Sequence, residues 1–394
     1  MAQKNIETKD ERERLYKDDE ELQLKISRTL GFAPSRKYDH RNTCLYICRK
    51  IFQEANSNTA FLKLGWRAPE DMPEYETIRM ASVGTSSFSR YNNDLFEQNN
   101  QRIEYDFVQA YKQIITRFFL PTNVFLEKAY KAETAEEKTE KFLRHMQPLF
   151  ETTDLTSKGF VVSPFKPTED KKFLNTFTFL RCEIRGGRPK EETFIGNDDN
   201  SSNALLSGKR TVHNQLLFGK SLIGEYYLSE VEIKQIHDYY NIDLYDIRQF
   251  KVLDTYTFRT AMGVADEYYN EIEKIKEIDH PLAERFYKDV RNYFHGFVGS
   301  NKGDVKNYTK TMFGKDNIKD LKARSKALGN AGVFSKAYQN ALYSIWRDLL
   351  LRYEQKYVNQ GLLAIKTDAL VFDREIPEFE ALTRAGVVRK KIIE

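Results

Sequence analysis

Three apolar residues, Ile103, Tyr105 and Phe107, alternate with polar ones. A period of two residues predicts a half-buried β-strand, because successive side chains of a strand point to opposite faces. The apolar spacing then becomes helical, in a stretch that we expect to end at Pro121, since proline cannot continue a helix. Asp106 is therefore placed at a strand-to-helix junction.

Two short apolar runs lie on either side of a three-residue tip over 362–372, and this pattern predicts a β-hairpin with Asp368 at its tip. A carboxylate at the end of an apolar strand is costly unless it is exposed, caps a helix or binds a metal. Asp106 or Asp368 alone is most simply a cap or turn residue. If the two converge, they have the arrangement that two-metal phosphoryl or nucleotidyl transfer needs.

Helical periodicity over 281–297 separates a polar stripe from an apolar one. The polar stripe is either a solvated surface or a phosphate-binding face, in which a lysine and amide and imidazole donors point to an anion. We also expect helices near 43–61 and 333–357, with Cys44 and Cys48 as core thiols. The polar stripe comprises Lys288, Asn292 and His295, and the apolar one Phe286, Val290, Phe294 and Phe297.

Composition narrows the class of protein. Hydrophobic residues make up 40% of the 394, enough to fill a core, which by the pattern begins near Ile78. The net charge is only +4, so nucleic-acid binding would need a local basic patch. Three cysteines and scattered histidines make a disulfide framework or a zinc enzyme improbable. No apolar run reaches the roughly 18 residues of a membrane helix, so we expect a soluble, unexported protein without a membrane partner.

The composition changes along the chain. Residues 1–24 are rich in charge and are typical of a solvated helix or tail. Over 155–255 the chain is richer in Gly, Asn, Asp and Ser, which predicts an inserted β-rich subdomain with a loop over 186–208. A second basic, glycine-punctuated loop is expected over 299–332.

Three short segments together resemble the motifs of family B DNA polymerases. Residues 105–112 are similar to motif A, Asp-x-x-Ser-Leu-Tyr-Pro, and keep its Asp and Tyr as Asp106 and Tyr111. Residues 288–296 resemble motif B, Lys-x-x-x-Asn-Ser-x-Tyr-Gly, with His295 at the Tyr position. Residues 366–369 resemble motif C, Asp-Thr-Asp-Ser, with Asp368 as its second Asp. Stretches at 179–184 and 227–240 resemble the protein-primed branch, so that the likeness covers roughly 78–385.

The resemblance implies an α+β fold: an antiparallel polymerase palm sheet with helical fingers and two insertions. It implies the following division: 1–40 charged leader; 41–155 N-terminal region and first part of the palm with motif A; 156–255 subdomain resembling the terminal-protein-contacting region; 256–300 fingers with motif B; 301–332 second insertion; 333–394 palm with motif C.

The implied activity is template-directed DNA polymerisation by a two-metal mechanism, in protein-primed replication of a phage, virus or linear plasmid, within the cytoplasm of the host cell. Two Mg²⁺ or Mn²⁺ ions would be held by the carboxylates of Asp106 and Asp368 and the carbonyl of Phe107. The implied partners are DNA template and primer, dNTPs, a possible terminal protein and a possible second polypeptide that supplies a thumb. The nucleotide would meet Tyr111, Lys288, Asn292, His295 and Lys366.

Departures from the family pattern leave other interpretations open. Lys366 replaces the first Asp of motif C, which places a cation near the metals, and neither an exonuclease domain nor a thumb is recognisable. One alternative is therefore a catalytically degenerate, polymerase-like nucleic-acid-binding replication protein. Another, if the three motifs are coincidental, is a capsid-associated or terminal-protein-like structural factor. Divalent-metal titration separates the first alternative from a polymerase, and template-dependent nucleotide incorporation excludes the second.

Overall fold

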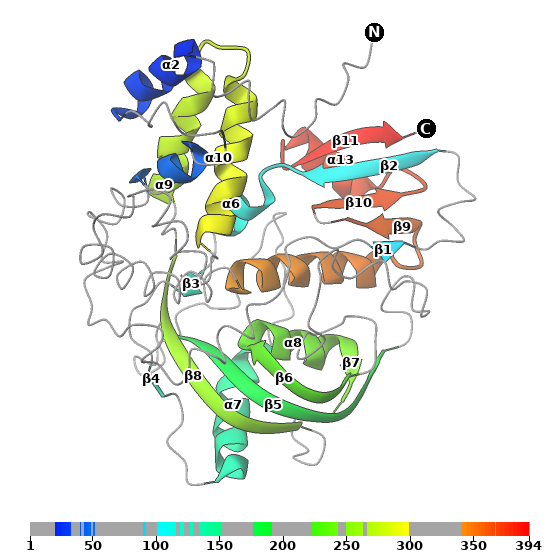
Figure 1. The fold of residues 1–394 in the computed structure, drawn as a ribbon. Coiled ribbons are helices and arrows are strands. Elements are labelled where there is room, and N and C mark those ends of the chain that lie inside the picture. The colour runs from blue at the N-terminus through cyan, green and yellow to red at the C-terminus, as the bar shows by residue number, and fades with distance from the viewer. Residues whose placement is uncertain are drawn as a thin grey trace, which may run out of the picture. The chain divides into compact units, whose positions relative to one another are not determined.

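The chain folds into two compact units, each built from two segments distant in the sequence (Figure 1). One unit comprises Met1–Trp66 and Val264–Ser335, and the other Arg67–Gly263 and Lys336–Glu394. The computed structural model describes residues 20–32, 40, 43–48, 50–51, 90–91, 101–115, 119–121, 127–128, 134–150, 176–190, 222–242, 250–262, 266–298, 340–366 and 368–393.

A five-stranded antiparallel sheet lies in the second unit and contains both the strand predicted from alternation and the hairpin predicted from two apolar runs. Its strand order is β1-β9-β10-β2-β11. Strand β2 (Arg102–Phe107) pairs with β10 on one side and with β11 on the other. The hairpin forms as expected, because two fully buried apolar runs flank the tip. The other strands are β1 (Arg90–Tyr91), β9 (Leu362–Ile365), β10 (Ala369–Phe372) and β11 (Val388–Ile393).

One face of this sheet packs against two helices through aromatic side chains. The alternate residues Tyr105 and Phe107 of β2 point to this face and are buried. Phe379 of α13 (Pro377–Arg384) stacks on Tyr105 with ring centroids 5.1 Å apart, and Trp346 meets Phe107 edge to face at 5.1 Å. Aromatic pairs add to the hydrophobic free energy of burial when they stack or meet edge to face. The opposite face of β2 is thereby left to its polar residues.

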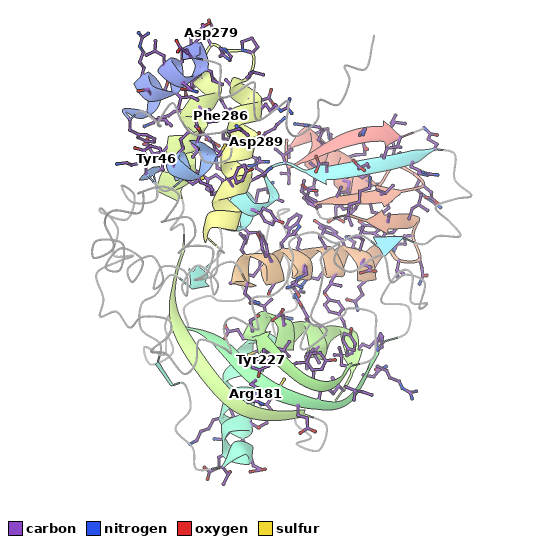
Figure 2. The ribbon with its side chains drawn as sticks, viewed as in Figure 1. Tyr46, Arg181, Tyr227, Asp279, Phe286 and Asp289 are labelled. Carbon is purple, nitrogen blue, oxygen red and sulfur yellow. The ribbon has the colours of Figure 1, made fainter. Side chains whose placement is uncertain are left out.

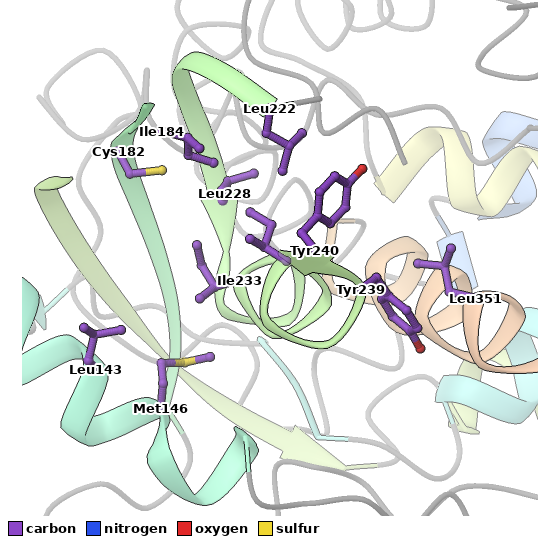
Figure 3. Packing of buried hydrophobic residues seen from close by; sticks show 11 residues of the cluster. Leu143, Met146, Cys182, Ile184, Leu222, Leu228, Ile233, Tyr239, Tyr240 and Leu351 are labelled. Carbon is purple, nitrogen blue, oxygen red and sulfur yellow. The ribbon is translucent and has the colours of Figure 1, made fainter. Parts of the chain in front are cut away.

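A second antiparallel sheet in the same unit has the order β3-β8-β5-β6, with β4 and β7 paired at its margins. Helices α7 (Ala135–Phe150) and α8 (Glu230–Tyr239) contact it, and their apolar side chains meet those of β5 and β6 in one buried cluster (Figure 3). The β-rich character expected near 155–255 is therefore present. The strands are β3 (Phe119–Pro121), β4 (Glu127–Lys128), β5 (Thr176–Pro189), β6 (Leu222–Ser229), β7 (Tyr240–Asn241) and β8 (Phe250–Met262).

Two expected boundaries in this unit are wrong. The helix after β2, α6 (Ala110–Ile115), ends before Pro121, which instead closes β3. A proline is accepted there because β3 is an outer strand of the described sheet, so that the missing N–H removes no second ladder bond. The loop expected from 186 begins later, because β5 continues to Pro189 past a register shift between Ile184 and Gly187. Residues 191–208 and the loop at 299–332 lie outside the described residues.

The helix described over 340–357 lies between the five-stranded sheet and α8 (Figure 1). Its aromatic side meets the sheet, and its polar side meets α8, where Gln235 Nε2 donates to the carbonyl of Ser344 at 2.8 Å. Arg347 donates to Glu232 at 3.3 Å, and both side chains are buried. The pKa of Glu232 is raised by its burial, although Arg347 opposes the shift. The helix therefore joins the two sheets through an apolar side and a charged side.

The first unit contains α2 (Glu20–Leu30), α9 (Asp266–Glu273), η4 (Lys274–Glu277) and α10 (Ala283–Val298). Leu22 and Ile26 of α2 are buried, and Lys25 donates to the carbonyl of Asp279, which Figure 2 labels, at 2.6 Å. Hence the described end of the expected charged leader is a packed amphipathic helix, and the core does not begin at Ile78. Cys44 and Cys48 are buried thiols, as expected.

The fold class is α+β with antiparallel sheets, as predicted. The finer six-part division of the chain stays a prediction. Among the described residues no helix is long and apolar enough to cross a membrane.

Candidate functional site

Asp106 lies on β2, on the face opposite the aromatic core. The burial of the strand alternates: Ile103, Tyr105 and Phe107 are buried, whereas Glu104 and Asp106 are partly exposed. Two turn residues then lead into α6, so the strand-to-helix junction expected at Asp106 is present. The sequence places a carboxylate where a strand ends and its polar face remains partly accessible.

Asp368 lies at the exposed tip of the β9–β10 hairpin, beside Asp106. Ala369 is the register partner of Asp106, and the Phe107 N–H donates to the Asp368 carbonyl at 2.8 Å. Residues 106 and 368, far apart in the sequence, are therefore neighbours at one end of the same sheet. The structure brings these two predicted carboxylate residues together, and their catalytic role stays a prediction.

Lys366, at the start of the same tip, forms an ion pair with Glu104 of β2. Its backbone N–H donates to the Ala369 carbonyl at 2.8 Å and closes the hairpin. Sequence reasoning recognised Lys366 as a departure but missed Glu104. The available signal was position: a residue two places before Asp106 on a strand points to the same face.

The two aromatic residues assigned to this site differ in what they expose. The Phe107 ring is buried against Trp346, so only its backbone would face a ligand. Tyr111, in the first turn of α6, is partly buried, and its ring lies 5.4 Å from that of Tyr343 on helix 340–357. Burial lowers the pKa of the Arg347 guanidinium, and the nearby Tyr111 side chain partly opposes this shift. The Tyr111 side chain therefore lies between α6 and the helix over 340–357.

The predicted polar stripe lies on α10, in the other unit. Lys288 and Asn292 are exposed, while Phe286 and Val290 are buried, as the helical periodicity predicted. The Lys288 ammonium lies 3.1 Å from the carboxylate of Glu284, one turn earlier. His295 is helical, but its side chain, like that of Phe294, lies outside the described residues. The lysine is therefore presented to solvent within its own unit.

Residues from the N-terminal part of the chain contact α10 and hold it in place. His40 Nε2 lies 2.8 Å from a carboxylate oxygen of Asp289, and the His40 ring lies 5.6 Å from that of Phe286; Figure 2 labels Phe286 and Asp289. The Cys48 thiol donates to the carbonyl of Val290 at 3.3 Å. These contacts come from a region that the sequence pattern did not connect to the helix.

A polar network supports the candidate site from the back of the sheet. The Tyr105 hydroxyl donates to Glu380 at 2.6 Å and accepts from the Ile376 N–H at 3.3 Å. Burial, together with the bond to Glu380, raises the pKa of Tyr105 to about 12. Hydrogen bonds from Lys390 and Tyr105 lower the pKa of Glu380. The strand that carries Asp106 is therefore anchored to α13.

Asp106 and Asp368 fit magnesium in one respect. Mg²⁺ is commonly bound by one or two carboxylates together with substrate phosphates and water, and this pair supplies two carboxylates at one sheet end. Within the described ranges, no group of three or more His, Cys, Asp or Glu side chains is placed to hold a metal. A cation held by this pair would need further ligands, such as phosphate and water.

Solved structures that resemble the fold are DNA polymerases. They are structures of phi29 DNA polymerase with primer-template DNA, with primer-template DNA and incoming nucleotides, and with single-stranded DNA, each with a TM-score of 0.49. Sequence identity is 12–13%, and each match covers 86% of this chain. The chain spans about half the length of these polymerase chains, 48–49%. No protein-family model and no curated protein matches the sequence.

Proposed function

We propose that the chain is a template-directed DNA polymerase that adds dNTPs to a primer, in the protein-primed replication of a phage, virus or linear plasmid. The observation that carries the proposal is the placement of Asp106 on β2 beside Asp368 at the tip of the β9–β10 hairpin, joined by the hydrogen bond from the Phe107 N–H to the Asp368 carbonyl. Both residues belong to segments that resemble polymerase motifs in their family order. Two adjacent carboxylates suit nucleotidyl transfer, because they can hold divalent cations, which neutralise the charge that develops on the attacking and leaving oxygens.

In this proposal each residue has a distinct task. Asp106 and Asp368, with the Phe107 carbonyl, would hold two Mg²⁺ or Mn²⁺ ions. When bound, these ions supply charge neutralisation at the triphosphate and at the primer 3′ oxygen. Tyr111 would contact the sugar, while Lys288, Asn292 and His295 of motif B and Lys366 of motif C would contact the nucleotide. A terminal protein and a second, thumb-bearing polypeptide belong to the proposal as possible partners.

Primer extension tests the proposed function. The intact chain is given a primed template and dNTPs with Mg²⁺, then with Mn²⁺, with and without a thumb-bearing partner. Asp106→Asn and Asp368→Asn should each lower incorporation by about 100-fold or more, because each removes a proposed ligand of the cations that stabilise charge at the reacting phosphate. Asp373→Asn, at the other end of β10, is the matched control and should keep activity. Equal activity in all four proteins would contradict the assignment.

A polymerase-like nucleic-acid-binding protein without catalysis is the second candidate. The observation that favours it is Lys366, whose ammonium stands in the motif C segment and pairs with Glu104. Its expected signature is DNA binding that Asp106→Asn and Asp368→Asn leave unchanged, together with no template-dependent incorporation under either metal.

A further inference from the structure

The ion pair between Lys366 and Glu104 connects the hairpin tip to β2 across an intervening strand. The Glu104 side chain is 14% exposed and that of Lys366 is 33% exposed, so the pair is partly shielded from water. Within the described residues Glu104 is the ion-pair partner of Lys366. Because both groups belong to the same unit as Asp106 and Asp368, their arrangement bears on the proposed site.

The strand register shows that this pairing is diagonal. Lys366 lies across from Ala369, to which its N–H donates, and Ala369 lies across from Asp106. Side chains directly opposite one another in antiparallel strands point to the same face. Lys366, Ala369, Asp106 and Arg389 of β11 therefore form one row across the sheet. Glu104 belongs to the next row, since its register partner on β10 is Val371.

The lysine thus extends toward residue 104, although Asp106 is the acidic residue in its own row. The intervening Ala369 has only a methyl group, so the long lysine side chain has room to cross β10. A lysine is a compact charge on a flexible stem and moves to whichever carboxylate stabilises it best. An ammonium that moved to Asp106 would neutralise that carboxylate and repel an incoming cation.

We propose that Glu104 is a positioning residue that holds the Lys366 ammonium away from Asp106, and so preserves the affinity of the Asp106 and Asp368 pair for a divalent cation. The inference rests on the proposed function. In this arrangement Glu104 balances the charge that the motif C substitution introduces, and it acts through Lys366 instead of touching the cation.

Binding of Mn²⁺ alone, followed by electron paramagnetic resonance on the full chain without nucleotide, tests the inference. Glu104→Gln should weaken Mn²⁺ binding by at least about threefold, because the released lysine turns to Asp106. Lys366→Met should bind Mn²⁺ at least as well as the unmodified protein. The double variant Glu104→Gln/Lys366→Met should recover the affinity of Lys366→Met. Glu140→Gln, which removes the exposed partner of Arg144 on α7, is the control and should change nothing.

The double variant decides between three roles of Glu104. Recovery supports positioning. If Glu104→Gln and the double variant bind Mn²⁺ equally weakly, Glu104 is a ligand of the cation and the proposal is overturned. Unchanged affinity in Glu104→Gln would also overturn it, because Glu104 would then have no effect on binding. Thermal unfolding by circular dichroism is recorded for each protein. Should the Gln variant not fold, Glu104→Asp withdraws the carboxylate by one methylene, and the same order of affinities is expected.

A second measurement separates this inference from the proposed function. Absence of Mn²⁺ binding, or binding insensitive to Asp106→Asn and Asp368→Asn, would contradict the proposed site itself. The reductive methylation rate of Lys366 then reports its partners directly. We expect Glu104→Gln/Asp106→Asn to be methylated several-fold faster than Glu104→Gln, because only the double variant deprives the lysine of both carboxylates. Equal rates in these two proteins would overturn the role assigned to Glu104.

Discussion

At the residue scale, polar side chains on the two faces of β2 have different partners. Glu104 and Asp106 point to one face, while Tyr105 points to the other and donates to Glu380. Glu380 also accepts from Lys390 on β11 at 2.8 Å. The alternation of the strand thus separates residues assigned to chemistry from those that fix the strand to α13.

The lowered pKa of Glu380 makes a prediction for acid stability. Because its pKa in the folded protein lies below the roughly 4.3 of an unfolded chain, its contribution is complete above that pH and is lost as the pH falls through the lower value. Glu380→Gln should therefore reduce the free energy of unfolding by about 0.5–1 kcal/mol at pH 7. The difference from the unmodified protein should shrink below about pH 4.

Urea denaturation at pH 7 and pH 3 measures this effect. Glu271→Gln removes an exposed partner of Lys274 and serves as a control with little expected change at either pH. A Glu380→Gln deficit that grows on acidification would mean that the carboxylate is not stabilised in the folded state.

At the element scale, the helix over 340–357 is buried on both sides, by aromatic contacts on one side and by a charged contact on the other. Trp346 and Tyr353 face the aromatic cluster, while Arg347 faces α8. A helix that is buried all round is typical of the centre of a large unit. Here the charged side selects one partner helix, because a buried charge must meet a specific counter-charge.

Removing one member of the Glu232 and Arg347 pair should destabilise this packing strongly. Arg347→Met leaves Glu232 buried without its cation and should cost about 3–5 kcal/mol. Glu232→Gln/Arg347→Met should be at least about 1 kcal/mol more stable than Arg347→Met, since neither member of the pair is then charged. The two proteins and Glu232→Gln are compared by urea denaturation in a double-mutant cycle. Additive losses would show that the two side chains are not coupled.

Elements with a clear period could be predicted from the sequence, whereas their partners could not. The alternation around Asp106, the hairpin before Asp368 and the stripes of α10 are local properties, and all three elements are present. The pairing of Glu104 with Lys366 depends on strand register between distant segments, which no local pattern encodes. For the same reason Pro121 was wrongly assigned as a helix end: its tolerance in β3 depends on which side of the strand is paired.

At the scale of the whole molecule, each unit is completed by a distant segment of chain. The first unit joins α2 to the region around η4 and α10, through buried Leu22 and Ile26 and through Lys25. Its charge content predicted a solvated segment, because its three buried residues, Leu22, Ile26 and Leu30, occupy one face of a helix whose other positions, apart from Leu24, are polar. Its packing indicates a structural role in the unit that carries Lys288.

Truncation on α2 tests that role with a matched pair of leucines. Leu22 is 1% exposed and Leu24 is 50% exposed. Leu22→Ala should cost about 2–4 kcal/mol and increase amide hydrogen exchange in α10, because it leaves a cavity in the shared core. Leu24→Ala should change neither quantity appreciably. Equal effects of the two substitutions, measured by thermal unfolding and hydrogen exchange, would contradict the packing of α2.

Among the described strands of its sheet β11 is an outer one, and this position has a consequence for how copies of the chain meet. A terminal strand presents unpaired backbone groups to which a strand of another molecule can add. On β11 the successive residues Arg389, Lys390 and Lys391 place positive charge on both faces, ahead of the exposed Ile392. Two such strands brought edge to edge would repel each other, so we expect this basic run to oppose self-association through this edge.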